Sequence, residues 1–105
     1  MKEELKNIRL ILKKKEFNFI YKTTNLINGK IYVGQHRTNS LEDGYIGCGI
    51  VRQSDARYNK GFHAAVAKYG YENFKREILE FCDIENIDKR EEYWIRELNS
   101  IDRKI

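Results

Sequence analysis

The sequence contains no proline and only two cysteines among its 105 residues. Cys48 and Cys82 lie far apart and form no Cys-x-x-Cys pair, which argues against a disulfide framework and for free thiols in a reducing compartment. A zinc site built from these cysteines with His36 and His63 is not expected either, because the close ligand pairs of structural zinc sites are missing.

Long apolar runs, internal repeats and low-complexity segments are also absent. No apolar stretch is long enough to cross a membrane, and the charged start MKEELKNIRLILKKK has no secretory cleavage pattern. With 41% hydrophobic and 34% charged residues, the chain can bury the core of one domain but hardly of two. We therefore expect one cytoplasmic domain over 17–105, preceded by a basic amphipathic helix within 1–16.

The charge that is present is unevenly distributed. The net charge is +4. Residues 1–40 carry nine lysines or arginines against three acids, whereas the remainder carries eleven against thirteen. A basic region beside aromatic hydroxyls favours a polyanionic partner, most simply nucleic acid. A solvated face that aids solubility is the alternative.

Hydrophobic periodicity predicts a small set of strands and helices. Strands are expected over 17–24, 30–35 and 73–82, and further helices over 62–69 and 84–99. Asn28 and Gly29 are typical of a hairpin turn between the first two strands. The glycine-containing stretch from His36 to Gly61 is interpreted as an ordinary loop.

Two tyrosines face each other in the predicted hairpin. If Thr24 pairs with Gly29, Tyr21 lies directly opposite Tyr32, and both rings share one face of the sheet. Such a pair can simply stabilise the sheet, or its hydroxyls can point at a substrate. The surrounding basic charge favours the second interpretation.

The last predicted helix places a carboxylate on its apolar stripe. The stripe comprises Ile84, Ile87, Trp94 and Leu98. Glu91 falls in its middle, whereas its neighbour Glu92 points to solvent. An unpaired carboxylate facing a core is costly, so Glu91 is expected to have an arginine, lysine or metal partner. A structural salt bridge to Arg52 or Arg57 is the alternative.

Together these motifs resemble the GIY-YIG nuclease family, especially the small free-standing homing endonucleases of bacteriophages. The resemblance covers 19–99 and rests on FIY, NGKIYVG, AVAKYGYENFKREILE and EEYWIRELN in that order. It implies an α/β (α+β) fold with a small three-stranded antiparallel sheet flanked by helices. It also implies an endonuclease that hydrolyses double-stranded DNA with one divalent metal ion, Mg²⁺ or Mn²⁺.

The resemblance assigns catalytic roles to individual residues. Tyr21 would be the base that activates water, Tyr32 would hydrogen-bond the water or the scissile phosphate, and Glu91 would bind the metal. His36 matches a histidine that some members carry just beyond the second triplet. Arg52 is the preferred catalytic arginine, since it follows the glycine loop where a helix could begin. Because the pKa of free tyrosine is about 10, Tyr21 is a poor base unless a cation lies close.

The chain departs from the family pattern in specific places. Phe19 stands where the first triplet has glycine, and the long loop leaves Arg37 and Arg57 as alternatives to Arg52. The G-Y-N segment that relatives often have beyond the last helix is missing. A catalytically weakened or inactive nucleic-acid-binding protein with this fold is therefore the alternative function, and dimerisation through the N-terminal helix is a third.

Basic side chains around the hairpin are expected to contact DNA phosphates. They are Lys13, Lys14, Lys15, Lys22, Lys30 and Arg37. Contacts of this kind position a protein on the duplex without reading its sequence. Sequence specificity and oligomeric state stay open.

Overall fold

The computed structural model describes residues 16–57 and 61–102. The elements in chain order are β1 (Phe17–Asn25), β2 (Ile31–Thr38), the 3-10 helix η1 (Gln53–Asp55), α2 (Gly61–Tyr69), the 3-10 helix η2 (Tyr71–Asn73), β3 (Phe74–Phe81) and α3 (Ile87–Asp102). The strands form one antiparallel sheet in the order β2-β1-β3, which confirms the expected fold class. The helix predicted within 1–16 lies outside the described residues. No helix in the described part is long and apolar enough to cross a membrane.

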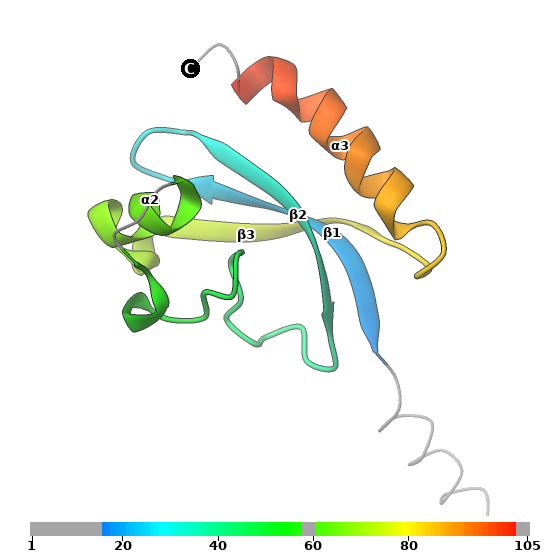
Figure 1. The fold of residues 1–105 in the computed structure, drawn as a ribbon, viewed down its shortest axis with the longest axis horizontal. Helices are drawn as coiled ribbons and strands as arrows, with labels where there is room; N and C mark the ends of the chain where they lie inside the picture. The colour runs from blue at the N-terminus through cyan, green and yellow to red at the C-terminus, as the bar shows by residue number, and fades with distance from the viewer. Residues whose placement is uncertain (1–15, 58–60, 103–105) are drawn as a thin grey trace, which may run out of the picture.

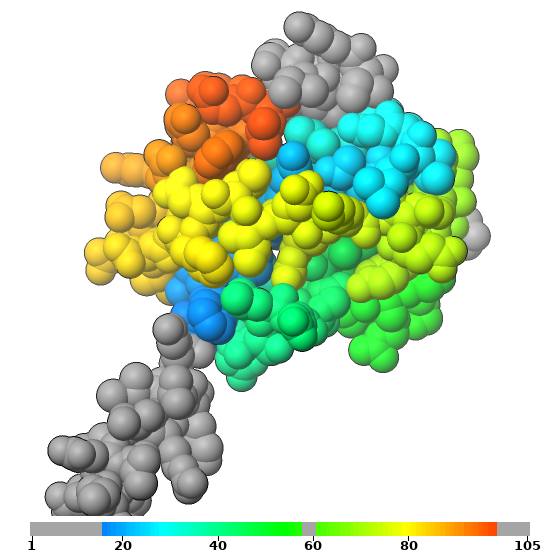
Figure 2. Space-filling model, turned by 180° about the vertical axis from the view of Figure 1, so that it is seen from behind, coloured from blue at the N-terminus to red at the C-terminus, as the bar shows by residue number. Residues whose placement is uncertain are grey.

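Both faces of the sheet are covered. Helix α3 packs on one face against β1 and β2 (Figure 1). The other face is covered by residues 39–57, which we call the covering loop, and by α2. Seen from behind, β3 (yellow) lies at the surface between α3 (orange) and the covering loop (green) (Figure 2).

Strand β1 is the centre of the fold because it pairs with both other strands. Its side chains alternate between the two faces of the sheet, and both faces are buried at this strand. Phe19 and Thr23 lie fully buried under the covering loop, and the Thr23 hydroxyl donates a hydrogen bond to the Ile46 carbonyl at 2.5 Å. Ile20, also fully buried, lies on the face that carries α3.

The hairpin register differs from the predicted one. Tyr21 pairs with Gly34 rather than with Tyr32, so the direct tyrosine pair was wrong. The reason is a longer connection over 26–30, in which the Asn25 side chain accepts a backbone hydrogen bond at 2.9 Å. Because the register moves by an even number of residues, both tyrosines still face the covering loop.

Helix α3 begins and ends later than predicted. It runs from Ile87 to Asp102, so Ile84 precedes the helix and is exposed, contrary to the predicted stripe. Ile87 is buried, whereas Trp94 and Leu98 are only half-buried. Part of the apolar stripe of α3 therefore stays accessible to solvent.

Polar contacts hold α3 on the sheet as well. Glu80 of β3 accepts hydrogen bonds from Arg90 Nε at 2.9 Å and from Trp94 Nε1 at 3.0 Å. Arg90 Nη2 also donates to Glu80 at 2.7 Å, which makes the contact bidentate. A bidentate arginine–carboxylate pair fixes direction as well as distance, so Glu80 orients the helix on the sheet.

Asp43 fixes the covering loop to the strands. Its carboxylate lies 2.8 Å from His36 Nε2 and accepts hydrogen bonds from the Tyr45 N–H at 3.0 Å and from Arg76 Nη1 at 3.1 Å. Partial burial by itself would raise the pKa of Asp43. The hydrogen bonds from His36 and the Tyr45 backbone outweigh it and hold the pKa well below its usual range.

Gly34 leaves the space that Tyr21 occupies. A Cβ atom on Gly34 would lie 2.5 Å from the Tyr21 hydroxyl oxygen and 2.8 Å from Cζ. Tyr21 and Gly34 are cross-strand partners, so the ring lies directly across the backbone of β2. A side chain at this position would displace the tyrosine.

We predict that Gly34→Ala destabilises the protein by about 1–3 kcal/mol, because the new methyl group overpacks the Tyr21 ring. In a domain of this size each kcal/mol lowers Tm by roughly 4–8 °C, which thermal unfolding measures. Tyr21→Phe removes the oxygen nearest to the new methyl group, so the double variant is expected to regain part of the loss. Strictly additive losses would show that the two residues do not compete for this space.

A second prediction concerns how the stability of the protein changes at acidic pH. Folding lowers the pKa of Asp43, so the ionised carboxylate stabilises the folded protein. This stabilisation is fully present above the pKa of the unfolded state, near 4, and is lost as the pH falls through the pKa of the folded state. Asp43→Asn is expected to cost about 1.5–3 kcal/mol at pH 7 and progressively less below pH 4, measured by urea unfolding. The exposed neighbour Glu42→Gln, with the same charge change, serves as control. If Asp43→Asn lowers the free energy of unfolding by the same amount down to pH 2, the pKa of Asp43 is not lowered by folding.

Candidate active site

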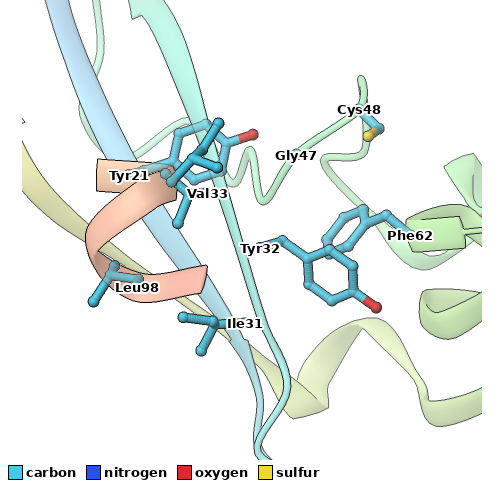
Figure 3. Close-up of a pocket in the computed structure, with 9 residues that line it drawn as sticks. Tyr21, Ile31, Tyr32, Val33, Gly47, Cys48, Phe62 and Leu98 are labelled. Carbon is cyan, nitrogen blue, oxygen red and sulfur yellow. The ribbon is translucent and has the colours of Figure 1, made fainter. Parts of the chain in front are cut away.

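A pocket of about 290 Å³ opens at the edge of β2 (Figure 3). It is lined by Tyr21, Ile31, Tyr32, Val33, Gly47, Cys48, Phe62, Ile95 and Leu98. These residues come from β1, β2, the covering loop, α2 and α3, so most of the fold contributes to the wall. The pocket brings together the two tyrosines to which the family resemblance assigns catalytic roles.

Tyr21 is held between two glycines. Its ring crosses Gly34, and a Cβ on Gly47 would lie 3.1 Å from its hydroxyl oxygen. Figure 3 shows the hydroxyl pointing toward Gly47. Tyr45 packs edge-on against the ring, with centroids 5.8 Å apart at an interplanar angle of 86°. The hydroxyl therefore has one well-defined position beside the pocket.

The electrostatic surroundings keep Tyr21 protonated. Burial raises the pKa of its hydroxyl far above the usual value, and the neighbouring Tyr45 raises it further. The charges of Cys48 and Glu91 act in the same direction. At neutral pH the hydroxyl is thus protonated and can donate a hydrogen bond.

Tyr32 lines the same pocket in a different orientation. Its ring contacts Phe62 edge-on, with centroids 4.5 Å apart. In Figure 3 its hydroxyl points away from that of Tyr21. The ring thus serves as a wall between the pocket and the core cluster of the covering loop and α2.

His36 is not among the described residues that line the pocket. Its ring stacks flat on Tyr45, with centroids 3.7 Å apart at an angle of 1°, while Nε2 contacts Asp43. His36 supports Tyr45, which in turn packs on Tyr21. Tyr45 could not be predicted from the sequence, because it lies in a loop without periodicity and the direction of its side chain cannot be inferred there.

No arginine is among the described residues that line the pocket. The Arg52 side chain is 71% exposed and lies 3.8 Å from Asp55. Arg57 is exposed, and Arg37 donates to Asn18 at 3.2 Å. The choice of a catalytic arginine stays a prediction.

The predicted DNA-contacting residues are placed in part. Lys30 is exposed in the hairpin connection, Arg37 is exposed at the end of β2, and Lys22 lies 3.9 Å from Glu77. The run 13–15 lies outside the described residues. These basic groups therefore occupy different parts of the hairpin, and DNA contact stays a prediction for each of them.

Glu91 has a neutral partner. The half-buried carboxylate accepts a hydrogen bond from Gln35 Nε2 at 3.1 Å, and the same amide donates to Asp88 at 2.8 Å. In the described part of the chain Glu91 forms no ion pair, so the salt bridge considered as an alternative was wrong. Glu92 is exposed, as expected, and pairs with Arg96 at 3.6 Å.

The carboxylates near Gln35 fit a hard cation that is completed by other ligands. Within 16–57 and 61–102, no three His, Cys, Asp or Glu side chains gather closely enough to hold a metal ion. Mg²⁺ is commonly bound by only one or two carboxylates together with waters and substrate phosphate. Glu91 and Asp88, which contact the same amide nitrogen, provide that donor set.

Comparison with known proteins points to phage endonucleases. No family model matches the chain, and no solved structure matches it at a significant level. Two proteins of Enterobacteria phage T4, segE and segB, both provisionally named endonucleases, are each 48% identical to this chain. The match to segE spans 63 residues, which is 60% of this chain and 26% of segE. The match to segB spans 67 residues, which is 64% of this chain and 26% of segB. Endonuclease segA of the same phage is 42% identical over 69 residues, 66% of this chain and 27% of the relative. The chain thus spans about a quarter of the length of these relatives and is similar to them over most of its own.

Proposed function

We propose that this chain is a metal-dependent DNA endonuclease of the GIY-YIG type. The similarity to the phage T4 seg proteins supports the class of activity. The observation that carries the proposal is that Tyr21 and Glu91 approach consecutive residues of β2, an edge strand of the sheet. Tyr21 crosses the strand at Gly34, and Glu91 is bonded to the next residue, Gln35.

Hydrolysis of a phosphodiester needs an aligned nucleophile and stabilisation of negative charge on the phosphoryl oxygens. Glu91, with Asp88 beside it, would hold Mg²⁺ or Mn²⁺, which supplies positive charge next to the phosphate. The protonated Tyr21 hydroxyl would donate a hydrogen bond to the attacking water or to a phosphate oxygen. It could accept a proton only after nearby positive charge lowers its pKa.

Other residues would bind and orient the substrate. Tyr32 would offer its hydroxyl at the pocket wall, and His36 would act through Tyr45 by fixing the ring that packs on Tyr21. Arg52 is exposed within the covering loop and would reach a bound phosphate only by moving its side chain. We keep it as the proposed catalytic arginine.

Double-stranded DNA is the proposed substrate. The exposed Lys30 and Arg37, together with Lys22 and the lysines at 13–15, would contact phosphates. Binding of this kind releases counterions, so affinity should fall steeply with salt and show little sequence preference.

A non-catalytic DNA-binding protein is the second candidate function. The observation that favours it is the lack of an arginine among the described residues lining the pocket. Incubation with supercoiled plasmid, with Mg²⁺ and with a chelator, separates the two functions. Nicked or linear product that forms only with metal supports the endonuclease, and DNA binding without any product supports the second candidate.

We predict that Glu91→Gln reduces Mg²⁺-dependent plasmid cleavage by about 100-fold or more, because an amide is a weak metal ligand. The protein is expected to stay folded and to bind DNA, since Gln35 can still donate to an amide oxygen and the charge beside Asp88 is removed. The exposed Glu92→Gln is the matched control and should cut at the wild-type rate. Normal cleavage by Glu91→Gln would remove this residue from the site.

Tyr21→Phe tests the hydroxyl while keeping the ring across Gly34. We expect the single-turnover cleavage rate to fall by about 100-fold, the lower range for a positioned proton-transfer group. Thermal unfolding is expected to change far less than the rate. Tyr93→Phe, which removes the hydroxyl of an exposed tyrosine on α3, is the control. A Tyr21→Phe enzyme with the wild-type rate would leave Tyr21 a purely structural residue.

A further inference from the structure

Gln35 connects the two halves of the proposed site. It follows Gly34 in β2, and consecutive strand residues point to opposite faces of a sheet. Gly34 therefore faces the covering loop and accommodates Tyr21, while Gln35 faces α3 and contacts Glu91. One dipeptide of the edge strand thus sets the position of the hydroxyl and of the carboxylate together.

The amide of Gln35 holds two like charges next to each other. Asp88 and Glu91 are three residues apart on α3, so their side chains lie on the same side of the helix. Gln35 Nε2 donates to Asp88 Oδ1 at 2.8 Å and to Glu91 Oε1 at 3.1 Å. Hydrogen bonds from the shared amide offset part of the repulsion between the carboxylates.

A neutral hydrogen-bond donor is better suited than an arginine or lysine to orient a carboxylate that binds a metal ion. An arginine or lysine would orient Glu91 but would also cancel the charge that attracts a divalent ion. Gln35 orients it without that cancellation. Within 16–57 and 61–102, the second oxygens of Glu91 and Asp88 accept no hydrogen bond.

We propose that Gln35 is a positioning residue that holds Glu91 and Asp88 in place for a divalent cation. This role rests on the proposed endonuclease function and deepens it, because it makes Asp88 a member of the metal site. Partners of metal-binding side chains commonly contribute 10- to 100-fold to metal affinity. Gln35 acts through Glu91 and Asp88 and needs no contact with the DNA.

The test is Mn²⁺ binding, measured on the protein alone by electron paramagnetic resonance. Gln35→Met keeps the length of the side chain without its donor, and we expect it to weaken Mn²⁺ affinity about 10-fold or more. Gln35→Asn keeps an amide that is too short to reach both carboxylates, and it should behave similarly. Trp94→Phe is the control for simple loosening of α3, since it removes the hydrogen bond to Glu80 and leaves both hydrogen bonds of Gln35 in place. It should lower Tm and leave the Mn²⁺ affinity within about twofold.

Several outcomes would overturn the role of Gln35. They are wild-type Mn²⁺ affinity in both Gln35 variants, an equal loss in Trp94→Phe, and the absence of Mn²⁺ binding by the wild-type protein. Plasmid cleavage is measured in parallel with Mg²⁺. If the wild-type protein binds Mn²⁺ but cuts no DNA, the proposed function fails, while the comparison of affinities still decides whether Gln35 positions the carboxylates.

Discussion

The close passage of the Tyr21 ring over the backbone at Gly34 is the contact on which the site depends. It is possible only because the cross-strand partner has no side chain. Once the ring lies there, its hydroxyl reaches the pocket at the strand edge, and the covering loop must close over it. Tyr45 and Gly47 form that cover, and Asp43 fixes the cover to the sheet through His36 and Arg76. The loop is thus as much a part of the site as the strands are.

Much of the fold could be predicted because its signals are local. Alternation of side chains indicated the strands, and helical spacing indicated α2 and α3 within a few residues. The register could not be predicted from the turn residues. Asn28 and Gly29 are typical of a short hairpin turn, but Asn25 takes part in the turn with its side chain and lengthens the connection. The face of the sheet on which each tyrosine lies was nevertheless predictable, because a register shift by an even number of residues does not change it.

The candidate site was predictable in its residue types more than in their partners. A carboxylate on an apolar stripe requires compensation, and that rule singled out Glu91. It could not identify Gln35, because an amide far away in the sequence gives no charge pattern to recognise. His36 was noticed beside the second tyrosine triplet, but its stacking on Tyr45 depends on how the covering loop folds back. Such loops have no periodicity from which a contact can be inferred.

The topology of the sheet has a consequence for the order of assembly. Strands β1 and β2 are joined by a short connection and can pair early, whereas β3 reaches β1 only across the covering loop and α2. Glu91 follows β3 on α3, so a chain emerging from the ribosome can form the tyrosine hairpin before Glu91, the proposed metal-binding carboxylate, has been synthesised. In the proposed endonuclease, the site would therefore be incomplete until α3 has been synthesised, and a translation product truncated before α3 would lack Glu91.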